Sequence, residues 1–386
     1  MNSSEISKNN AVLVDVQRMK LRNLITGFFQ IQKTRVAMGN RVVASFNIQM
    51  GQEPGTKQED MDKEAKGLIE KLAKEYKLVS QAYIDKSYVI TERQDGNKVS
   101  TEVKLGKNDG LEKVINKMHA DERSDVRNIR DKVDYELMTP FMELLEAESH
   151  LKNTIEKEAI KHPMWDMFFK DVYGCGPLYA AICIAYLDVH KARHASSFWR
   201  YAGLDVVPVT TDEPGENGDH LQYKIIHEED GTEYKVVVCE GRSRKHTEDV
   251  TYINKDGKEA IKKGLTYNPV LKTKLIGVMG PNLIKKGGYY AQCYRDYRVR
   301  LDNRPDLKDY TDGHKHNMAI RYMVKQFLRD LWSVWRAYEG YEISEPYEVA
   351  YLGRKPHKYN AYHERIAQEN SAMTFGQYLK SIGVDK

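Results

Sequence analysis

Hydrophobic positions recur at helical spacing over the first part of the chain. Apolar side chains return every three or four residues between 11 and 48, and this spacing predicts one long helix. The segment GQEPGTKQED interrupts the pattern, and a second helix is predicted over 59–78, ending near Tyr76. Helical spacing resumes at about residue 109 and continues to 161, so the whole region is predicted to be largely helical.

Two prolines divide the helical pattern that follows. Thr139-Pro140 predicts a kink or a restart, because threonine caps helices well and proline suits the first helical position. His162-Pro163 is predicted to end the segment. Three short helices are then expected within residues 164–204.

Strict alternation of polar and apolar residues marks the predicted strands. SYVITERQDGNKVSTEVKL alternates around Asp95-Gly96-Asn97, which is a strong signal for a hairpin. LQYKIIHEEDGTEYKVVVCEG alternates around Asp230-Gly231, and a further turn is predicted at Asp256-Gly257, which together indicate a small β insert. Helical spacing then returns at about 269–280, 287–302 and 314–339.

These elements predict a mainly α fold with long N-terminal helices and a small β insert. The predicted parts are a helical N-terminal domain over 1–162 with a hairpin near 87–105, a helix-hairpin-helix module over 163–205, the β insert over 206–262, a basic helical part over 263–340 and a C-terminal tail over 341–386.

Composition narrows the class of protein. The 386 residues are 41% hydrophobic and 30% charged, enough for a sizeable core. Four scattered cysteines form no CxxC pair and no zinc spacing, which is typical of reduced thiols. No run of about 18 apolar residues is present, and the N-terminus has no secretory pattern. We therefore expect a cytoplasmic protein with no membrane partner.

Charge is unevenly distributed along the chain. The net charge is only +4, but residues 241–304 hold 15 Lys or Arg against 6 Asp or Glu. Tyrosines are interleaved with these basic residues. A block of this kind is often a solvated surface, but with aromatic residues it favours a polyanionic partner.

The segment FKDVYGCGPLYAAICIAYL places two glycines and a proline in four positions. Amides at a helix start lack internal partners and lie at the positive end of the helix dipole, so anions bind there. A side chain at Gly174 or Gly176 would block a ligand's approach, and Pro177 gives up no useful donor. The pattern predicts a helix-hairpin-helix that holds phosphates through Gly174, Cys175 and Gly176. The alternative is a plain tight turn between two core helices.

Downstream motifs extend this pattern. In order they are F-x-x-Y-A-G-L-x-x-x-P, N-x-x-L-K, a tyrosine-rich helix and A-x-R-x-x-x-x-x-x-L-x-x-L. This order resembles the C-terminal domain of the bridge-RNA-type insertion-sequence transposases, known from the IS-one-ten, IS-one-sixteen and IS-nine-oh-two elements. The matching residues are Gly174, Gly176, Ala180, Phe198, Tyr201, Ala202, Gly203, Leu204, Pro208, Asn268, Leu271, Lys272, Tyr294, Ala319, Arg321, Leu328 and Leu331.

The chain departs from that family in two respects. The family has an N-terminal RNase H-like domain with four acidic residues, whereas AVLVDVQ with Asp15 runs directly into a helical pattern here. We assign no metal ligands and identify no cofactor; a divalent metal would be needed only at an acidic site not recognised in the sequence. The family's serine nucleophile lies just before the position of Asn268, where KKGLTYNPVLK has Thr266 as the nearest hydroxyl.

Candidate catalytic residues are therefore Thr266 and Ser243, the latter flanked by Arg242 and Arg244 in EGRSRKH. The arginines could lower the hydroxyl pKa or stabilise a leaving oxygen. The alternative for both is a surface hydroxyl in a basic loop. The DNA-binding candidates are Gly174, Cys175, Gly176, Arg242, Arg244, Lys245, Lys262, Lys263, Lys272, Lys274, Arg295 and Arg298.

Two of these groups have a simpler alternative. The four lysines beside Asn268-Pro269 form either a phosphate-binding strip or a solvated helix end. Arg295 and Arg298 share a helix with Tyr294 and Tyr297, where base stacking with phosphate contact and plain tyrosine packing are equally open.

The sequence leads to three hypotheses. The first is a DNA-binding transposase or recombinase-like protein of a mobile element or phage, in which a hydroxyl attacks a phosphodiester. The second is a non-catalytic protein derived from such a transposase that binds structured DNA or RNA. The third is a helical scaffold. Expected partners are DNA, a guide or structured RNA, and a second copy of the chain paired through the long helices.

Overall fold

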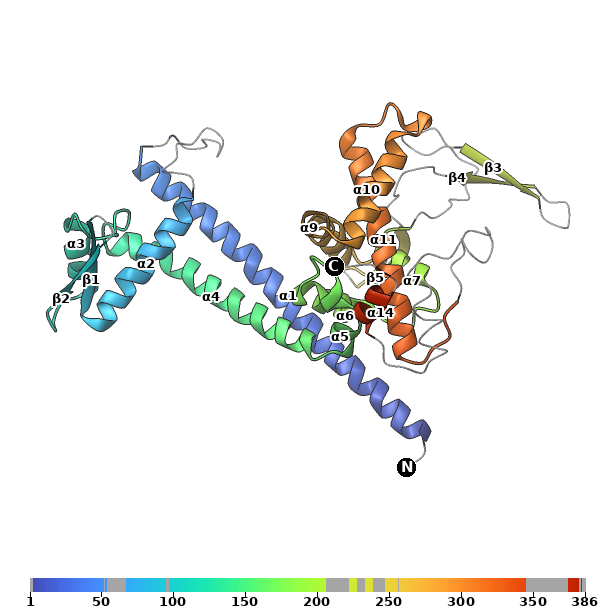
Figure 1. Cartoon of the computed structure of the whole chain (residues 1–386), viewed down its shortest axis with the longest axis horizontal. Helices are drawn as coiled ribbons and strands as arrows, with labels where there is room; N and C mark the ends of the chain where they lie inside the picture. The colour runs from blue at the N-terminus through green and yellow to red at the C-terminus, as the bar shows by residue number, and fades with distance from the viewer. Residues whose placement is uncertain are drawn as a thin grey trace. The chain divides into compact units, whose positions relative to one another are not determined.

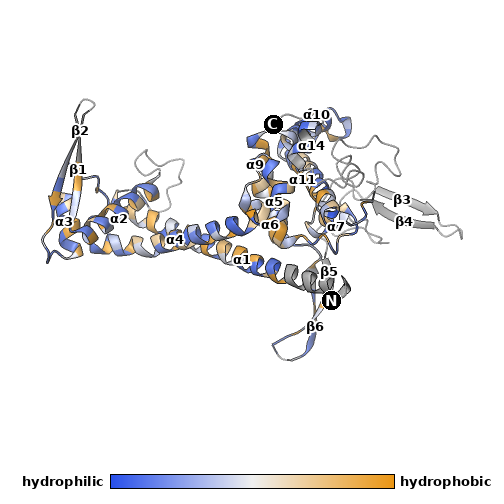
Figure 2. Cartoon of the chain, turned by 60° about the horizontal axis from the view of Figure 1, so that its bottom comes forward, coloured by the Kyte–Doolittle hydropathy of each residue, from blue (hydrophilic) through white to orange (hydrophobic). Residues whose placement is uncertain are grey.

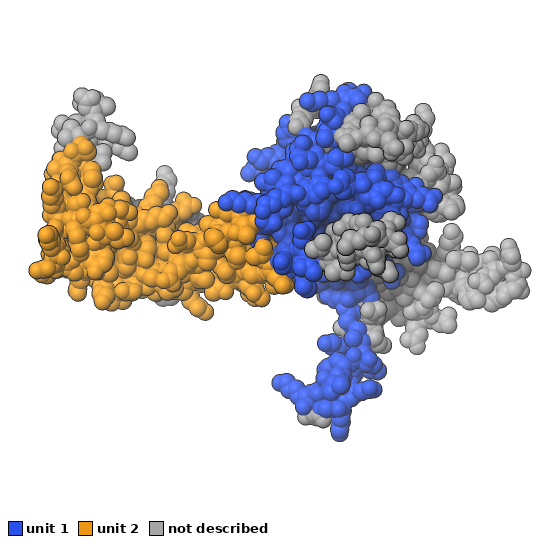
Figure 3. Space-filling view, turned by 90° about the horizontal axis from the view of Figure 1, so that it is seen from below, with its two compact units in different colours: residues 1–22, 155–386 blue, residues 23–154 orange. Residues whose placement is uncertain are grey.

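The computed structural model of the chain is mainly helical (Figure 1). It describes residues 3–51, 53, 67–94, 97–205, 222–227, 233–238, 247–255, 257–344, 374–381 and 383. The chain divides into two compact units, one of residues 1–22 and 155–386 and one of residues 23–154, with the divisions inside two long helices (Figure 3). No helix in the described ranges has the length and apolar character needed to cross a membrane.

The 23–154 unit is built on an antiparallel pair of long helices. α1 (Ser3–Gln49) faces α4 (Lys132–Ile160), and both carry polar and apolar residues on different sides (Figure 2). The Gln32 amide donates to Glu148 at 2.9 Å, and Gln49 donates to Asp134 at 3.0 Å. These two contacts fix the antiparallel register.

Shorter elements close the core at one end of this pair. They are α2 (Leu68–Asp85), β1 (Ser87–Gln94), β2 (Asn97–Lys104) and α3 (Leu111–Ala120). β1 and β2 form the antiparallel hairpin predicted from the alternation. The buried core residues are Val42, Phe46, Leu68, Leu72, Val79, Ala82, Leu105, Val114, Ile115, Met118, Val126, Ile129, Met138 and Phe141.

A buried carboxylate holds the segment between α3 and α4. Glu75 on α2 accepts from the main-chain amides of Asn128 and Ile129 at 2.7 and 3.0 Å. The Asn128 side chain also donates to Glu75 at 2.5 Å. Three donors satisfy the carboxylate inside the core, where an unpaired one would be costly.

The other unit carries the region expected to bind nucleic acid. Its first helices are α5 (Pro163–Met167), the 3-10 turn η1 (Phe169–Asp171), α6 (Pro177–Tyr186) and α7 (Ala195–Tyr201). Two separate antiparallel hairpins follow, β3 (Gln222–His227) with β4 (Glu233–Val238) and β5 (Thr247–Ile253) with β6 (Glu259–Leu265). The β insert is thus two two-stranded ribbons in the described residues.

The basic helices complete this unit. They are α8 (Pro269–Lys274), the π turn η2 (Leu275–Met279), α9 (Gly280–Lys286), α10 (Tyr289–Asp302), η3 (Pro305–Leu307), α11 (Asp312–Tyr338) and α14 (Phe375–Ser381). α8, η2 and α9 form one continuous run. Pro281 lacks an amide and its ring would clash with the Gly277 carbonyl in a regular helix, which explains the wider π turn before it.

The core of this unit gathers around α11. Phe168, Phe169 and Tyr290 all lie against Phe327, with ring centroids 5.5, 6.4 and 5.5 Å away. The Trp332 indole donates to the Ala192 carbonyl at 2.8 Å. α6 is buried over the whole of Ala180–Ala185, and its alanines let neighbouring elements approach closely.

Several predicted boundaries differ from the structure. The second helix spans Leu68–Asp85 and not 59–78, although 54–66 lie outside the described residues. The pattern over 109–161 is broken at 121–131, between α3 and α4. No restart occurs at Pro140, which lies inside α4. His162-Pro163 does end α4 and begins α5.

Candidate nucleic-acid interface

The glycine turn before α6 is packed on one side. Gly174 has φ +85°, and a Cβ there would lie 2.9 Å from the Asn282 carbonyl oxygen and 3.1 Å from the Leu283 Cα. The Asn282 side chain donates to the Gly174 carbonyl at 2.7 Å. Gly174 is therefore required for the close approach of α9, and contrary to the expectation from the sequence it does not leave room for a phosphate.

Cys175 also belongs to the interior. Its side chain is buried, and its amide donates to the Val172 carbonyl at 3.0 Å. Burial raises the pKa of its thiol, and nearby Cys183 raises it further. Contrary to the sequence expectation, Cys175 offers a phosphate neither an exposed side chain nor a free amide.

Gly176, unlike Gly174 and Cys175, is not packed against a neighbouring element. It caps α6 with φ −74°, a conformation open to any residue, and a Cβ there would meet nothing within 4 Å. Within the described residues, the amides of Gly176 and Leu178 have no hydrogen-bond acceptor, and Pro177 has no amide. Neither packing nor backbone conformation requires a glycine at 176, so it leaves space in front of unpaired donors.

The predicted helix-hairpin-helix module lacks a regular α-helix directly before its hairpin. Only the single 3-10 turn Phe169–Asp171 precedes the hairpin, after the five-residue α5. Val172 and Ile182, on either side of the turn, are both buried.

A second group of predicted residues meets where α7 ends. The Asn268 amide donates to the Tyr201 carbonyl at 2.8 Å, and its side chain donates to the Tyr201 hydroxyl at 3.3 Å. Gly203 has φ +64°, and a Cβ there would lie 2.6 Å from the Tyr267 ring. The motifs Y-A-G-L and N-x-x-L-K, whose contacting residues are 67 positions apart in the sequence, thus lie against each other.

Asn268 also begins the first basic helix. Its side-chain oxygen accepts from the Leu271 amide at 3.0 Å, and Pro269 occupies the first helical position, as predicted. The Lys272 ammonium lies 4.7 Å from the centre of the Tyr267 ring. Partial burial lowers the pKa of Lys274. The capped helix therefore brings Lys272 against Tyr267, next to the end of α7.

α11 adds two cations on one helical face. The Trp199 indole of α7 donates to the Lys325 carbonyl at 2.9 Å, and the Lys325 ammonium lies 5.4 Å from that ring. Burial lowers the pKa of Lys325, the Asp205 carboxylate raises it, and the Arg321 charge lowers it. Arg321 and Lys325 are thus close enough to repel each other.

Arg321 is the least compensated of these groups. It is half-buried, and loss of water lowers the pKa of its guanidinium. Within the described ranges it makes no hydrogen bond and no ion pair. A half-buried guanidinium without a partner is stabilised by an anion. We call the following set the α7 junction: Trp199, Tyr201, Gly203, Asp205, Thr266, Tyr267, Asn268, Lys272, Arg321 and Lys325.

Thr266 lies in this junction, directly before Tyr267. Its hydroxyl oxygen is buried and has no hydrogen-bond partner. A hydroxyl nucleophile needs a base within hydrogen-bond reach, and none is present among the described residues. The geometry at Thr266 suits binding better than attack on a phosphodiester.

The remaining predicted residues have mixed outcomes. Arg242, Ser243, Arg244 and Lys245 lie outside the described residues, as does the side chain of Lys263. Lys262 lies over the Tyr252 ring at 4.8 Å, on the β5–β6 ribbon.

The predicted arginines on α10 are engaged in contacts within the chain. Arg295 donates to the Gln292 side chain, and Arg298 binds Asp302 at 3.1 Å and Asp312 at 2.7 Å. Two carboxylates neutralise Arg298, which makes it a poor phosphate contact. On the same helix, Tyr297 stacks on Tyr322 with ring centroids 4.0 Å apart. Of the two alternatives for this helix, tyrosine packing is the one observed.

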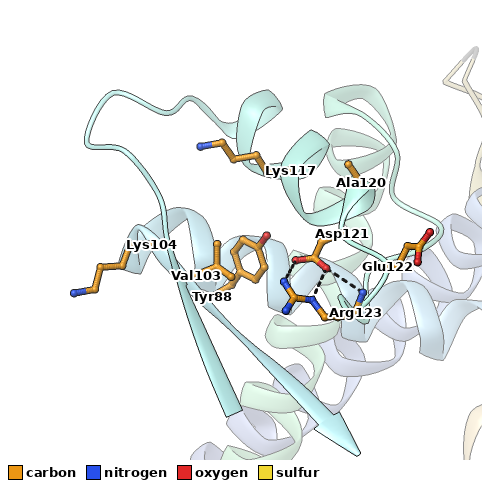
Figure 4. A pocket seen from close by; sticks show the side chains of 8 residues that line it. All are labelled: Tyr88, Val103, Lys104, Lys117, Ala120, Asp121, Glu122 and Arg123. Atoms are coloured by element: carbon orange, nitrogen blue, oxygen red, sulfur yellow. Dashed lines mark hydrogen bonds and ion pairs between the residues drawn. The ribbon is translucent and has the colours of Figure 1, made fainter. Parts of the chain in front are cut away.

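The 23–154 unit has a surface pocket of about 680 Å³ beside the β1–β2 hairpin (Figure 4). Tyr88 and Lys117 line it together with Arg123. Lys117 is paired with Asp109 at 2.7 Å and Arg123 with Asp121 at 3.2 Å. Two of the three cations that line the pocket are thus already neutralised, which makes it a weaker anion site than the α7 junction.

Comparison with known proteins adds no further constraint. No protein-family model, curated protein or solved structure matches the chain.

Sequence reasoning overlooked Lys325 and Trp199. The available signal was AIRYMVKQFL, in which an arginine and a lysine four residues apart interrupt an apolar helix face. Arg321 was noted only as part of the family resemblance.

Proposed function

We propose that the chain binds DNA through its sugar-phosphate backbone at the α7 junction, as a transposase- or recombinase-like protein of a mobile element or phage. The observation that carries the proposal is the half-buried, unpaired guanidinium of Arg321 beside Lys325. A phosphate oxygen would supply the missing acceptor, and a guanidinium binds phosphate with two parallel hydrogen bonds.

Other features of the unit support a backbone contact over base reading. Lys272 and Lys274 lie on the capped helix beside the junction, and the Gly176 and Leu178 amides are further donors without an acceptor in the described residues. Lysines and main-chain amides position DNA without distinguishing its sequence. The proposal therefore predicts similar affinity for unrelated duplexes.

Replacement of Arg321 tests the proposal. We expect Arg321→Gln to weaken binding to a fluorescent duplex at least tenfold, because one charge-assisted contact contributes about 1.5–3 kcal/mol. Arg123→Gln is the matched control, since it removes the same charge from the other unit, where Arg123 pairs with Asp121. Affinity is measured by fluorescence anisotropy. Equal affinity of both variants and the wild type would contradict DNA binding at the α7 junction.

The second candidate is non-catalytic binding of structured DNA or RNA. It is favoured by the Thr266 hydroxyl, which has no hydrogen-bond partner and no base in reach among the described residues. The purified chain is incubated with linear and branched DNA, with and without co-purified RNA, and examined for covalent adducts and strand cleavage. The binding-only candidate predicts neither product. An adduct that disappears in Thr266→Ala or Ser243→Ala would instead establish catalysis by that hydroxyl.

A further inference from the structure

The β5–β6 ribbon exposes apolar side chains that a two-stranded hairpin cannot cover by itself. Ile253 and Ile261 are 72% and 69% exposed, and Val250, Tyr252 and Leu265 are also exposed. Isolated two-stranded ribbons are only marginally stable in water. In the described part of the chain, neither edge of this ribbon is paired with another strand.

The hydrogen-bond pattern shows which main-chain groups point outward from β6. The Asn254 amide donates to the Lys258 carbonyl at 2.9 Å, so these opposite residues form a hydrogen-bonded pair. Opposite residues in an antiparallel ladder alternate between bonded and non-bonded pairs. The register pairs Tyr252 with Ala260, which is therefore bonded, and Thr251 with Ile261, which is not. The amide and carbonyl of Ile261 face the open edge.

Glu259 and Lys263 follow the same rule, because they lie two positions either side of Ile261. The open edge of β6 thus presents the donors and acceptors of Glu259, Ile261 and Lys263. These three positions also share one face of the ribbon. The sequence Glu-Ala-Ile-Lys-Lys along this edge is self-complementary.

We propose that β6 is an interface for a second copy of this chain, which adds its own β6 antiparallel across the open edge. Centred on Ile261, the pairing places Ile261 opposite itself. Glu259 then lies opposite Lys263 of the second copy, once on each side of the centre. Each of these pairs joins opposite charges, and the exposed Ile261 side chains of the two copies lie against each other.

The alternative arrangements are disfavoured by the same residues. A parallel pairing would set Glu259 against Glu259 and Lys263 against Lys263. The β5 edge has Glu248 and Asp249 but no lysine at a matching position, so it has no such self-complementarity. In the antiparallel pairing Lys262 lies opposite Ala260 of the second copy, and within the chain it lies over the Tyr252 ring of β5.

The proposal is independent of nucleic-acid binding, and cysteine crosslinking tests it directly. In the full chain with Cys239→Ser and Cys293→Ser, Ile261→Cys places two thiols at the two-fold axis. Their Cα atoms would be about 5.5 Å apart, within disulfide range. Ile253→Cys is the matched control, equally exposed but on β5. A disulfide-linked dimer from Ile261→Cys alone is expected; equal crosslinking of both variants, or none from Ile261→Cys, would overturn the proposal.

Sedimentation of chains without added cysteine gives a second measurement. We expect a concentration-dependent dimer in the wild type, weakened about tenfold or more in Glu259→Lys because two attractive pairs become repulsive. Circular dichroism establishes that the variant is folded. A wild type that remains monomeric at all accessible concentrations, or a dimer that Glu259→Lys leaves unchanged, contradicts pairing through β6.

Discussion

At the scale of single residues, the two glycines of the turn have different physical roles. Gly174 combines φ +85° with a main-chain contact from α9, whereas Gly176 has an ordinary conformation and open space at its Cα. Both look alike in the sequence, because the requirement at Gly174 comes from Asn282 and Leu283, more than a hundred residues away. Only Gly176 fits the expectation that a side chain was left out for a ligand.

This difference predicts that substitutions at the two glycines change the free energy of unfolding by different amounts. Gly174→Ala is expected to lower the free energy of unfolding by about 1–3 kcal/mol, since it strains the backbone and meets the Asn282 carbonyl. Gly176→Ala should leave that free energy within about 0.5 kcal/mol. Urea denaturation followed by circular dichroism measures both. Equal destabilisation by the two substitutions would contradict the assignment.

At the scale of the elements, local sequence patterns predicted the fold class and most elements of the chain. Asn268-Pro269 and His162-Pro163 begin helices, because cap and proline act within one turn. The interruption between α3 and α4 was missed, since Glu75 on α2 holds that segment through contacts that no local pattern contains. Pro140 failed as a boundary because the packing of α4 overrides its local preference.

The candidate site was less predictable for the same reason. The motif around Asn268 identified Thr266, Asn268 and Lys272. The α7 junction, in which they lie near Arg321 and Lys325, depends on how α7 packs against α11. Arg298 had the right chemistry but is neutralised by Asp302 and Asp312. Spacing along a helix reveals which residues share a face but does not reveal which acids oppose them.

The cap of α5 predicts a dependence of stability on pH. His162 accepts from the Met164 amide at 3.2 Å and packs against Trp335, and burial lowers its pKa from 6.5 to about 4. The unfolded chain therefore binds the proton more readily. The stabilisation is present above pH 6.5 and is lost as pH falls toward 4, by up to about 3 kcal/mol.

His162→Asn keeps a side-chain acceptor for the cap but does not titrate. Unfolding free energies of the wild type and the variant are measured between pH 7.5 and 4.5. We expect the wild type to lose more stability than the variant over that range. Parallel curves would show that His162 is not held neutral by burial.

At the scale of the whole molecule, the proposed anion site lies within one of the two compact units. Arg321, Lys325 and Lys272 belong to the α7 junction, whereas Lys117 and Arg123 in the pocket of the 23–154 unit are paired with carboxylates. The β5–β6 ribbon belongs to the same unit as the α7 junction. Two copies joined at β6 would therefore bring two such sites into one particle.

The salt dependence of DNA affinity tests the backbone-binding account most directly. Each phosphate neutralised by the protein releases counterions, so a site that engages about six phosphates gives a slope near −5 for log K against log salt. We expect such a slope for the wild type on unrelated duplexes, and a slope shallower by about one unit for Arg321→Gln. Absence of DNA binding at low salt, or an affinity that does not change with salt, would contradict the account.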